Sequence, residues 1–337
     1  MSGPVRVAVS GLGYWGPNLV RNFEAISGCK LVAICDSDPD ALARGIALTA
    51  EAEPVSDFGE LLANDQIDAI ALATPVPTHA DLAVRVLESG KHCFVEKPLA
   101  QSVADAQRAV DAADKADRQL MVGHLLEYHP AVEALSGLIA DGELGDLLYV
   151  YGNRQNLGRI RSDENALWSL GAHDVAVMLA LLGEVPNEVE ARGEAYLRPG
   201  VEDVVFGYLR FPSGVAAHLH LSWLDPHKER RLTVVGSKRM AVFDDMRIEG
   251  KLTVYDKGFD EDSRSWGEYI ARAGGSWSPR IANSEPLRTE LEHFINSIRS
   301  GTPARSDGRS GLRVVSVLEQ LQQSLDQHAA ERKQKGG

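Results

Sequence analysis

Short apolar runs alternate with amphipathic segments through the first third of the chain. The runs are mostly uncharged, as in strands buried on both faces, and lie at residues 5–9, 30–35, 68–73, 91–95 and 119–123. Apolar positions at helical spacing fill the gaps between them, as at residues 79–89 and 102–116. Strands that alternate with helices form a parallel sheet with helices on both faces. The pattern therefore predicts an α/β domain, a doubly wound Rossmann fold over residues 1–124.

The periodicity changes after residue 124. Helical spacing at residues 131–140 and 166–182 gives way to short apolar stretches joined by turns such as Pro212-Ser213-Gly214. These stretches are residues 147–155, 189–196, 204–211, 215–223, 231–235, 240–243 and 252–255. Short connections join antiparallel strands. We therefore expect a second, α+β domain over residues 125–337 with a large, mostly antiparallel sheet.

The last eighty residues are expected to mix loop and helix. Residues 259–283 are rich in glycine and mixed in charge, which predicts a long surface loop or lid. Helices are predicted at residues 287–299 and 312–327, and the tail from about residue 329 is expected to be frayed.

Charge and composition exclude several classes of protein. The chain has 48 acidic and 35 basic residues, a formal net charge of −13, which argues against binding to nucleic acid. No apolar run is long enough to span a membrane, and the first strand begins too early for a leader peptide, so we expect a cytoplasmic protein. The three cysteines lack metal-ligand spacing, and no metal site is predicted.

A glycine turn follows the first apolar run. Gly11, Gly13 and Gly16 form a G-x-G-x-x-G motif between a predicted strand and a predicted helix. In dinucleotide-binding units such glycines allow a tight turn, approach of a pyrophosphate, and close packing of helix on strand. The next strand ends at Asp36, where a carboxylate can bind ribose hydroxyls. No arginine adjoins Asp36 and Asp38, so we expect NAD rather than NADP as the cofactor.

Two further residues are suited to chemistry on a hydroxyl group. Glu96-Lys97-Pro98 follows the strand ending at Val95, and ligands of parallel sheets bind at the carboxyl ends of strands. A lysine there can stabilise an alkoxide. His173 precedes Asp174 near the start of a predicted helix, and imidazole is suited to accept and return a hydroxyl proton near neutral pH.

These motifs, in this order, resemble the glucose-fructose oxidoreductase, inositol dehydrogenase and MocA (Gfo/Idh/MocA) family. The similarity rests on the glycine turn, the Thr74-Pro75 turn with His79, Glu96-Lys97-Pro98, and Gly171-Ala172-His173-Asp174. It implies NAD(P)-dependent oxidation or reduction of a sugar, polyol or nucleotide-linked sugar, with Lys97 and His173 as catalytic residues and Glu96 nearer the cofactor. The family commonly has an aspartate four residues before the histidine, where this chain has Ser169.

The predicted site divides into a cofactor part and a substrate part. The cofactor contacts expected are Gly11, Gly13, Tyr14, Trp15, Gly16, Asp36, Ser37, Thr74, Pro75, His79, Glu96, Lys97 and His124. The substrate contacts expected are Arg154, Asn156, Arg159, Arg161, Asn165 and Ser169, where the arginines could hold a diphosphate or form a solvated charged loop.

The sequence before His173 and a second segment in the predicted sheet resemble those of dehydrogenases from polysaccharide and nucleotide-sugar pathways. These include UDP-N-acetylglucosamine and UDP-N-acetylglucosaminuronate 3-dehydrogenases. This similarity rests on residues 165–169 and 222–228. The expected reaction is oxidation at C3 of such a sugar. Alternatives are a free sugar or inositol-type polyol dehydrogenase, a ketoreductase in the reverse direction, an NAD-dependent glycosidase, and a dinucleotide-binding regulator without catalysis. A homodimer or homotetramer through the second domain's sheet is also expected.

Overall fold

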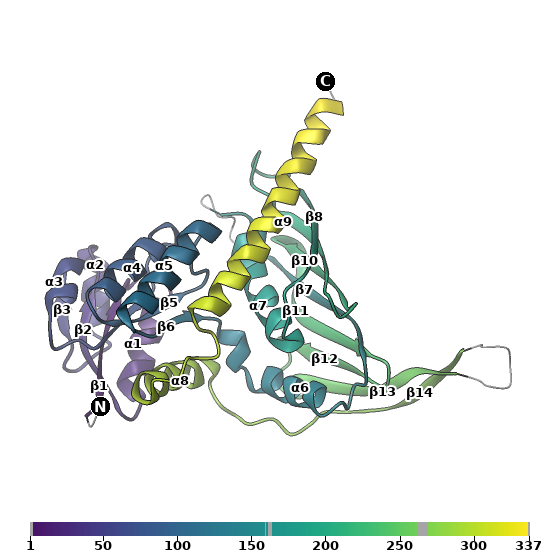
Figure 1. Ribbon diagram of the computed structural model, residues 1–337, viewed down its shortest axis with the longest axis horizontal. Coiled ribbons are helices and arrows are strands. Elements are labelled where there is room, and N and C mark those ends of the chain that lie inside the picture. Colours follow the sequence, from purple (N-terminus) through teal and green to yellow (C-terminus); the bar gives the residue numbers. More distant parts are fainter. Residues whose placement is uncertain (1–2, 159, 161–163, 262–268, 336–337) are drawn as a thin grey trace. The chain divides into compact units, whose positions relative to one another are not determined.

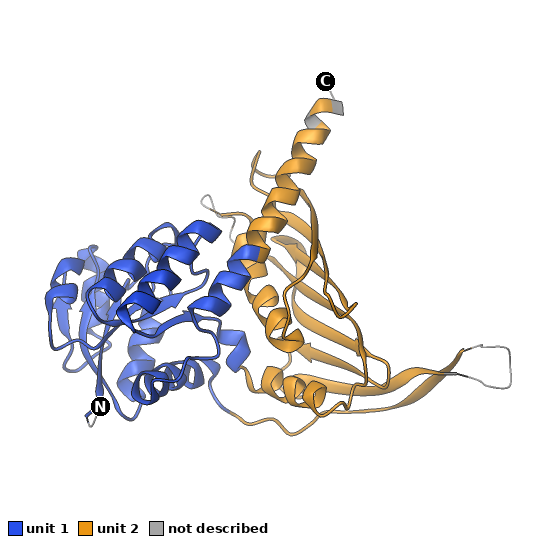
Figure 2. Cartoon of the chain, viewed as in Figure 1, with its two compact units in different colours: residues 1–128, 284–316 blue, residues 129–283, 317–337 orange. Residues whose placement is uncertain are grey.

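The chain folds into two compact units (Figure 2). The computed structural model describes residues 3–158, 160, 164–261 and 269–335. Unit 1 comprises residues 1–128 and 284–316, and unit 2 comprises residues 129–283 and 317–337. The first boundary lies close to the predicted residue 124. The prediction that everything after it belongs to the second domain is wrong, because residues 284–316 return to unit 1.

Unit 1 contains a six-stranded parallel sheet in the order β3-β2-β1-β4-β5-β6 (Figure 1). Its strands are β1 (Val5–Ser10), β2 (Cys29–Cys35), β3 (Glu53–Val55), β4 (Ala69–Leu72), β5 (His92–Glu96) and β6 (Leu120–Gly123). Every pairing is parallel, which confirms the doubly wound Rossmann prediction. The strand order reverses between β1 and β4, and in such sheets a ligand binds outside the carboxyl ends of the strands at this switch point.

Helices connect these strands, and three of those described begin at a residue whose side chain caps the helix. They are α1 (Gly16–Ala25), α2 (Pro39–Ile46), α3 (Phe58–Ala63), α4 (His79–Glu88) and α5 (Val103–Ala116), with short turns η1 (Val76–Thr78) and η2 (Leu125–Tyr128). The side chains of Asp38, Asp57 and Ser102 cap α2, α3 and α5 by accepting a backbone N–H two or three residues ahead. Such caps satisfy N–H groups that have no partner inside the helix.

Helix α8 (Pro286–Ser300) belongs to unit 1 because its apolar face completes that unit's core. Leu291 and Phe294 are buried in the same cluster as Leu19 and Phe23 of α1. The rings of Phe94 and Phe294 lie 5.8 Å apart between centroids. A segment far along the chain thus covers one side of the N-terminal sheet, which no local pattern predicted.

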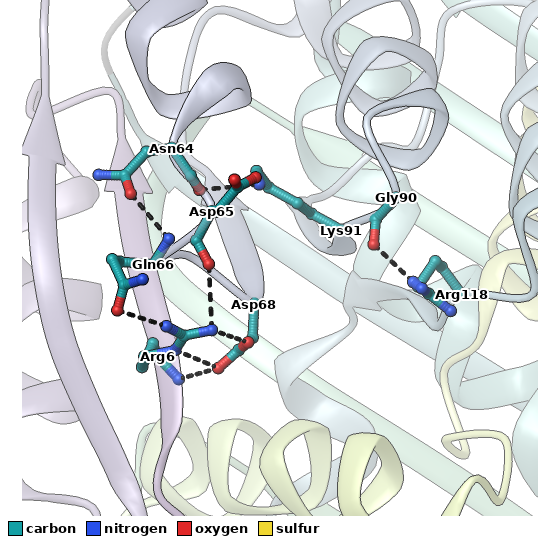
Figure 3. Close-up of polar contacts among 8 residues, drawn as sticks. All are labelled: Arg6, Asn64, Asp65, Gln66, Asp68, Gly90, Lys91 and Arg118. Atoms are coloured by element: carbon teal, nitrogen blue, oxygen red, sulfur yellow. Dashed lines mark hydrogen bonds and ion pairs between the residues drawn. The ribbon is translucent and has the colours of Figure 1, made fainter.

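A polar network holds the strand ends opposite the glycine turn (Figure 3). The Arg6 guanidinium donates to both oxygens of Asp68, at 3.0 and 2.7 Å, and the Arg6 backbone N–H donates to Asp68 at 2.8 Å. Nearby, the Lys91 ammonium donates to the carbonyl of Asn64 at 2.9 Å. Arg6 is the second residue of β1, and Asp68 directly precedes β4. Their contacts therefore fix the register of two central strands.

Unit 2 is built on an eight-stranded sheet in the order β14-β13-β12-β11-β7-β10-β9-β8 (Figure 1). Its strands are β7 (Leu147–Leu157), β8 (Glu188–Glu194), β9 (Val204–Arg210), β10 (Ala216–Ser222), β11 (Leu224–Gly236), β12 (Met240–Asp244), β13 (Leu252–Glu261) and β14 (Tyr269–Trp277). The pairing is antiparallel except between β7 and β10, which confirms the mostly antiparallel prediction.

The helices of unit 2 are α6 (Pro130–Ala140), α7 (Ala172–Leu182) and the later part of α9 (Gly308–Lys335). Glycines on the sheet allow close contact with them: a Cβ on Gly152 would meet Met178 of α7 at 3.3 Å, and one on Gly207 would meet Leu321 of α9 at 3.3 Å. No helix in the described part of the chain is long and apolar enough to cross a membrane.

Two expectations for the C-terminal region are wrong. The predicted loop over residues 259–283 contains the end of β13 and all of β14. Nearly every residue of β14 is exposed, so the strand lacks the alternation of apolar and polar residues that marks a half-buried strand. The predicted frayed tail continues as helix to Lys335. Its Ala, Glu, Arg, Lys and Gln residues favour helix even without a buried face.

The ion pair of Arg6 and Asp68 yields a stability prediction. Burial raises the pKa of Asp68, but the hydrogen bonds and charge of Arg6 outweigh burial and hold it below its ordinary value. The ionised form therefore stabilises the fold above the unfolded-state pKa, and this stabilisation is lost as pH falls through the folded-state pKa. We expect Asp68→Asn to lower the free energy of unfolding by roughly 1–2 kcal/mol at neutral pH, measured in urea.

The matched control is the exposed pair of Lys30 and Glu51, whose charged atoms lie 3.3 Å apart. Glu51→Gln should change stability by less than about 0.5 kcal/mol, because exposed pairs contribute little. Equal losses in the two variants would contradict the assigned role of Asp68.

Candidate active site

The backbone of the glycine turn fits tightly against itself and against β4. Gly11 has φ +91°, in the region that favours glycine. A Cβ on Gly11 would lie 2.6 Å from the carbonyl of Ala73, and one on Gly16 would lie 1.9 Å from the carbonyl oxygen of Gly11. Two of the three glycines are therefore required by the protein's own packing.

Gly13 is different, because no atom of the described residues requires it to be glycine. Its φ is ordinary, and no described atom lies within 4 Å of where a Cβ would stand. Helix α1 follows with no side-chain cap and no acidic residue in its first turn, although it begins with Gly16-Pro17. An open glycine before an uncapped helix N-terminus fits the pyrophosphate of a dinucleotide, which needs close backbone approach and free N–H groups.

Asp36 closes the turn at the end of β2. Its carboxylate accepts the backbone N–H of Leu12 at 2.6 Å and that of Asp38 at 2.9 Å. The residue predicted to bind ribose thus also holds the glycine turn. Its neighbour Ser37 and the side chain of Tyr14 are exposed, and their predicted cofactor contacts remain predictions.

Glu96 and Lys97 lie at the carboxyl end of β5. The indole Nε1 of Trp15 donates to Glu96 Oε1 at 2.6 Å, and the backbone N–H of Lys97 donates to Glu96 Oε2 at 3.3 Å. Burial raises the pKa of Glu96 to about 7, although Lys97, Trp15 and the backbone N–H act in the opposite direction. The predicted cofactor turn and the predicted catalytic lysine are therefore joined through one carboxyl group.

The buried side chain of His79 contacts the segment that contains Lys97 and Pro98. Its ring is 1% exposed, and its two nitrogens each lie 2.8 Å from a backbone carbonyl oxygen, those of Pro98 and Thr74. Burial lowers the pKa of His79. The ring ties the turn at Thr74-Pro75 to the Lys97-Pro98 segment, and its predicted contact with the cofactor stays a prediction.

His124 follows β6 and is also buried, at 1% exposure. Burial and, to a smaller extent, the charge of Lys97 lower its pKa to about 3. Neither ring nitrogen has a hydrogen-bond partner among the described residues. A neutral, unpartnered imidazole at the carboxyl end of a strand is compatible with a ligand contact, so its predicted role remains a prediction.

In unit 2, His173 is the second residue of α7, directly after a π-helical turn at Leu167–Gly171. Such turns have i→i+5 hydrogen bonds and are frequent at functional sites. Ser169 lies within this turn, so it is not one regular α-helical turn from His173 as the sequence predicted. Both residues are partly buried. Their predicted contacts with the substrate remain predictions.

Asn165 anchors the start of this segment inside the protein. Its amide donates to Glu202 at 2.6 Å and to Gln322 of α9 at 2.9 Å, and its oxygen accepts the backbone N–H of Trp168 at 3.2 Å. The Trp168 indole also donates to Gln322, at 3.2 Å. Asn165 is buried, and both its amide nitrogen and its side-chain oxygen make hydrogen bonds within the protein. This argues against its predicted contact with the substrate.

Arg154 anchors the other end. Its guanidinium is buried in β7 and donates to both oxygens of Asp174, at 2.5 and 3.2 Å. Removing one member of such a pair leaves an uncompensated buried charge. This arginine therefore fixes the residue next to His173, and its predicted contact with a diphosphate stays a prediction.

Of the remaining substrate candidates, Arg159 and Arg161 lie outside the described residues. Asn156 lies at the end of β7, and its side-chain oxygen is buried without a partner among the described residues. An orphaned acceptor is compatible with its predicted ligand contact. The described residues contain no cluster of His, Cys, Asp or Glu that could hold a metal ion.

Sequence reasoning missed the supporting residues. Glu202 and Gln322, which hold Asn165, lie 37 and 157 positions away from it along the chain. Neither stands in a motif, so no local signal could have indicated either residue. The bond from Trp15 to Glu96 spans 81 positions and was missed for the same reason.

Comparison with known proteins assigns both units. The model of an oxidoreductase family with an NAD-binding Rossmann fold, Gfo/Idh/MocA, matches residues 5–124, and the model of the Gfo/Idh/MocA C-terminal domain matches residues 132–242. The chain belongs to the Gfo/Idh/MocA oxidoreductase family. Unit 1 of this family member is thus an NAD-binding domain, in agreement with the open Gly13 and the uncapped α1.

Other members of the Gfo/Idh/MocA family resemble the chain over nearly its full length. A protein of known crystal structure from Magnetospirillum magnetotacticum is 31% identical, with a TM-score of 0.82 and coverage of 95% of this chain and 100% of that one. The UDP-N-acetylglucosamine 3-dehydrogenase of Acidithiobacillus ferrooxidans is 26% identical over 96% of this chain and 97% of its own length. Its crystal structure has a TM-score of 0.79. The scyllo-inositol 2-dehydrogenase of Bacillus subtilis is 27% identical, over 91% of this chain and 90% of its own.

The open face of Gly13 yields a prediction about binding. Gly13→Ala should leave the fold intact, because a Cβ there meets no described atom within 4 Å. The added methyl would instead occupy the space needed by the pyrophosphate. We expect the dissociation constant for NAD, measured by titration calorimetry, to rise by about tenfold or more.

Gly137 in α6 offers a matched control, since it too has ordinary φ and nothing within 4 Å of its Cβ position. Gly137→Ala should bind NAD like the wild type and be slightly more stable, because alanine favours helix. An unchanged affinity in Gly13→Ala would place the pyrophosphate elsewhere.

Proposed function

We propose that the chain is an NAD-dependent dehydrogenase that oxidises a sugar hydroxyl, with C3 of a nucleotide-linked sugar as the reacting carbon. UDP-N-acetylglucosamine and its uronate are the proposed substrates. The similarity to the UDP-N-acetylglucosamine 3-dehydrogenase, which extends over 96% of this chain, carries the proposal. NAD, when bound, supplies the hydride acceptor.

Two side chains are proposed to be catalytic. Lys97 of unit 1 donates a hydrogen bond to the reacting oxygen and stabilises negative charge that develops on it. His173 of unit 2 accepts the hydroxyl proton. The support for these roles is where the two residues lie in the fold. Lys97 directly follows strand β5, and His173 follows a π-helical turn anchored by Asn165.

The diphosphate of the substrate requires cationic partners. Because Arg154 pairs with Asp174, the proposal rests on Arg159 and Arg161 for this role. Asn156 and Ser169 are proposed to bind sugar oxygens. Guanidinium groups bind phosphate oxygens in pairs, which suits them to the diphosphate.

Specific observations favour two rival functions. Dehydrogenases of scyllo-inositol and myo-inositol match the chain at 27% and 25% identity, which supports a polyol substrate, oxidised or formed in the reverse direction. A 2,7-anhydro-N-acetylneuraminate hydratase is 27% identical over 88% of this chain, which supports chemistry without net oxidation, as in an NAD-dependent glycosidase. A regulator without catalysis would need neither Lys97 nor His173.

Kinetics with a substrate panel separates these functions. We expect formation of reduced cofactor, followed by absorbance, to be fastest with a UDP-linked N-acetylhexosamine or its uronate, slower with free sugars and inositols, and faster with NAD than with NADP. His173→Asn should lower turnover by roughly 10²–10⁴-fold, because asparagine cannot accept the proton. Its affinity for NAD should remain that of the wild type.

A different ranking would redirect the proposal. Fastest turnover with inositol would favour the polyol dehydrogenase, and product without net reduction of NAD would favour the hydratase or glycosidase class. Wild-type turnover in His173→Asn would contradict the proposed base.

We also propose that the chain forms a dimer or tetramer through the sheet of unit 2. The sheet face turned away from α7 carries a row of stacked rings, with centroids 6.2 Å apart for Tyr149 and Tyr151, 5.1 Å for Tyr151 and His218, and 4.5 Å for Phe206 and His220. Tyr149 and Phe206 are 44% and 51% exposed. A second copy would remove these apolar rings from water.

Sedimentation should give the mass of a dimer or tetramer, and a monomer would contradict the proposal.

A further inference from the structure

Among the described residues of unit 1, two buried carboxyl groups and one partly buried carboxyl group have no role as acid or base in the proposed reaction. They are Glu96 at the end of β5, Glu127 in η2 and Glu290 in α8. Glu127 and Glu290 are 3% and 1% exposed, and each has one side-chain oxygen without a partner among the described residues. Glu96 differs from both, because its two oxygens accept hydrogen bonds from segments assigned to cofactor binding and to catalysis.

The bond from Trp15 to Glu96 joins the side chain of a glycine-turn residue to the segment that contains Lys97. Trp15 occupies the N-cap position of α1 and packs against the core of unit 1. Its indole reaches Glu96 at 2.6 Å, while the same carboxyl group accepts the N–H of Lys97. A movement of the Glu96 side chain would therefore change both the start of α1 and the backbone of Lys97.

We propose that Glu96 is a positioning residue that joins the glycine turn to the Lys97 segment through Trp15, and that gain of a proton by its carboxyl group weakens this link. The inference rests on the proposed function, in which the turn binds NAD and Lys97 acts in catalysis. In this role, the ionisation of Glu96 determines how firmly the glycine turn is held as the pH changes. A residue that only lies near the cofactor would not need this property.

The charges around Glu96 determine when it ionises. Burial is the largest influence and raises its pKa to about 7, while the ammonium group of Lys97 favours the carboxylate. Burial raises the pKa of Glu290, from α8, and the charges of Glu96 and Glu127 raise it further, so Glu290 is held in its neutral form. His124, at the end of β6, is neutral at this pH and adds no charge. Glu96 thus changes its ionisation within the physiological range.

Ionisation changes the strength of the link. A hydrogen bond to a carboxylate is roughly twice as strong as one to a neutral carboxyl group. Above the pKa of Glu96, the hydrogen bond from the Trp15 indole to its carboxylate is strong. Below that pKa, the hydrogen bond to the neutral carboxyl group is weaker. Since the turn must be ordered to receive NAD, affinity for NAD should fall as pH falls through about 7.

The test measures NAD binding by calorimetry between about pH 5.5 and 8.5 for the full chain. We expect the wild-type dissociation constant to rise about fivefold toward low pH. Glu96→Gln keeps an acceptor for the indole but cannot ionise, so its affinity should be weak and independent of pH. Trp15→Phe removes the donor, and its affinity should be similarly weak at all pH values. Glu127→Gln is the matched control, a buried carboxyl group without a contact to the turn, and should keep the wild-type profile.

A readout without NAD separates this inference from the proposed function. The fluorescence that Trp15 contributes, obtained as the difference between wild type and Trp15→Phe, should change with pH around a midpoint near 7, and Glu96→Gln should abolish the change. Lack of NAD binding together with this titration would refute the proposed function and leave the link standing. Wild-type affinity in Trp15→Phe, or an unaltered pH profile in Glu96→Gln, would overturn the link.

Discussion

Close packing of backbone against backbone at the end of β1 is the constraint on which the candidate site depends. The carbonyl of Gly11 occupies the space that any side chain on Gly16 would need, and Gly11 itself lies against Ala73. Asp36 then holds the turn from the next strand. These contacts favour a conformation of the turn in which Gly13 is left open beside an uncapped helix. Binding of a dinucleotide requires such a surface to exist before the ligand arrives.

Unit 2 meets a different constraint, because its site segment is fixed by buried polar groups rather than by glycines. Arg154 and Asp174 neutralise one another beneath α7, and Asn165 is held by Gln322 at the other end of the segment. Buried groups of this kind are costly unless every partner is present. Buried polar contacts thus flank His173, which suits the proton-accepting role proposed for it.

The sequence predicted the features that depend on neighbouring residues. The strands of unit 1 were found because burial on both faces leaves continuous apolar runs, and Gly11 and Lys97 were found because they lie directly after strands. Partners distant in sequence were not predictable. The sequence around Arg154 does not reveal its pairing with Asp174. Helix α8 belongs to unit 1 through a shared core that local periodicity does not specify. Strand β14 was missed because exposure on both faces removes the pattern.

The central claim, hydride transfer from C3 of a nucleotide-linked sugar, is tested most directly by isotopic labelling. UDP-N-acetylglucosamine carrying deuterium at C3 is incubated with the protein and NAD, and the reduced cofactor is analysed by mass spectrometry. The account predicts that each molecule of reduced cofactor carries one deuterium. Reduced cofactor without deuterium would show that another carbon is oxidised, and the absence of reduced cofactor with this sugar and its uronate would contradict the assigned substrate class.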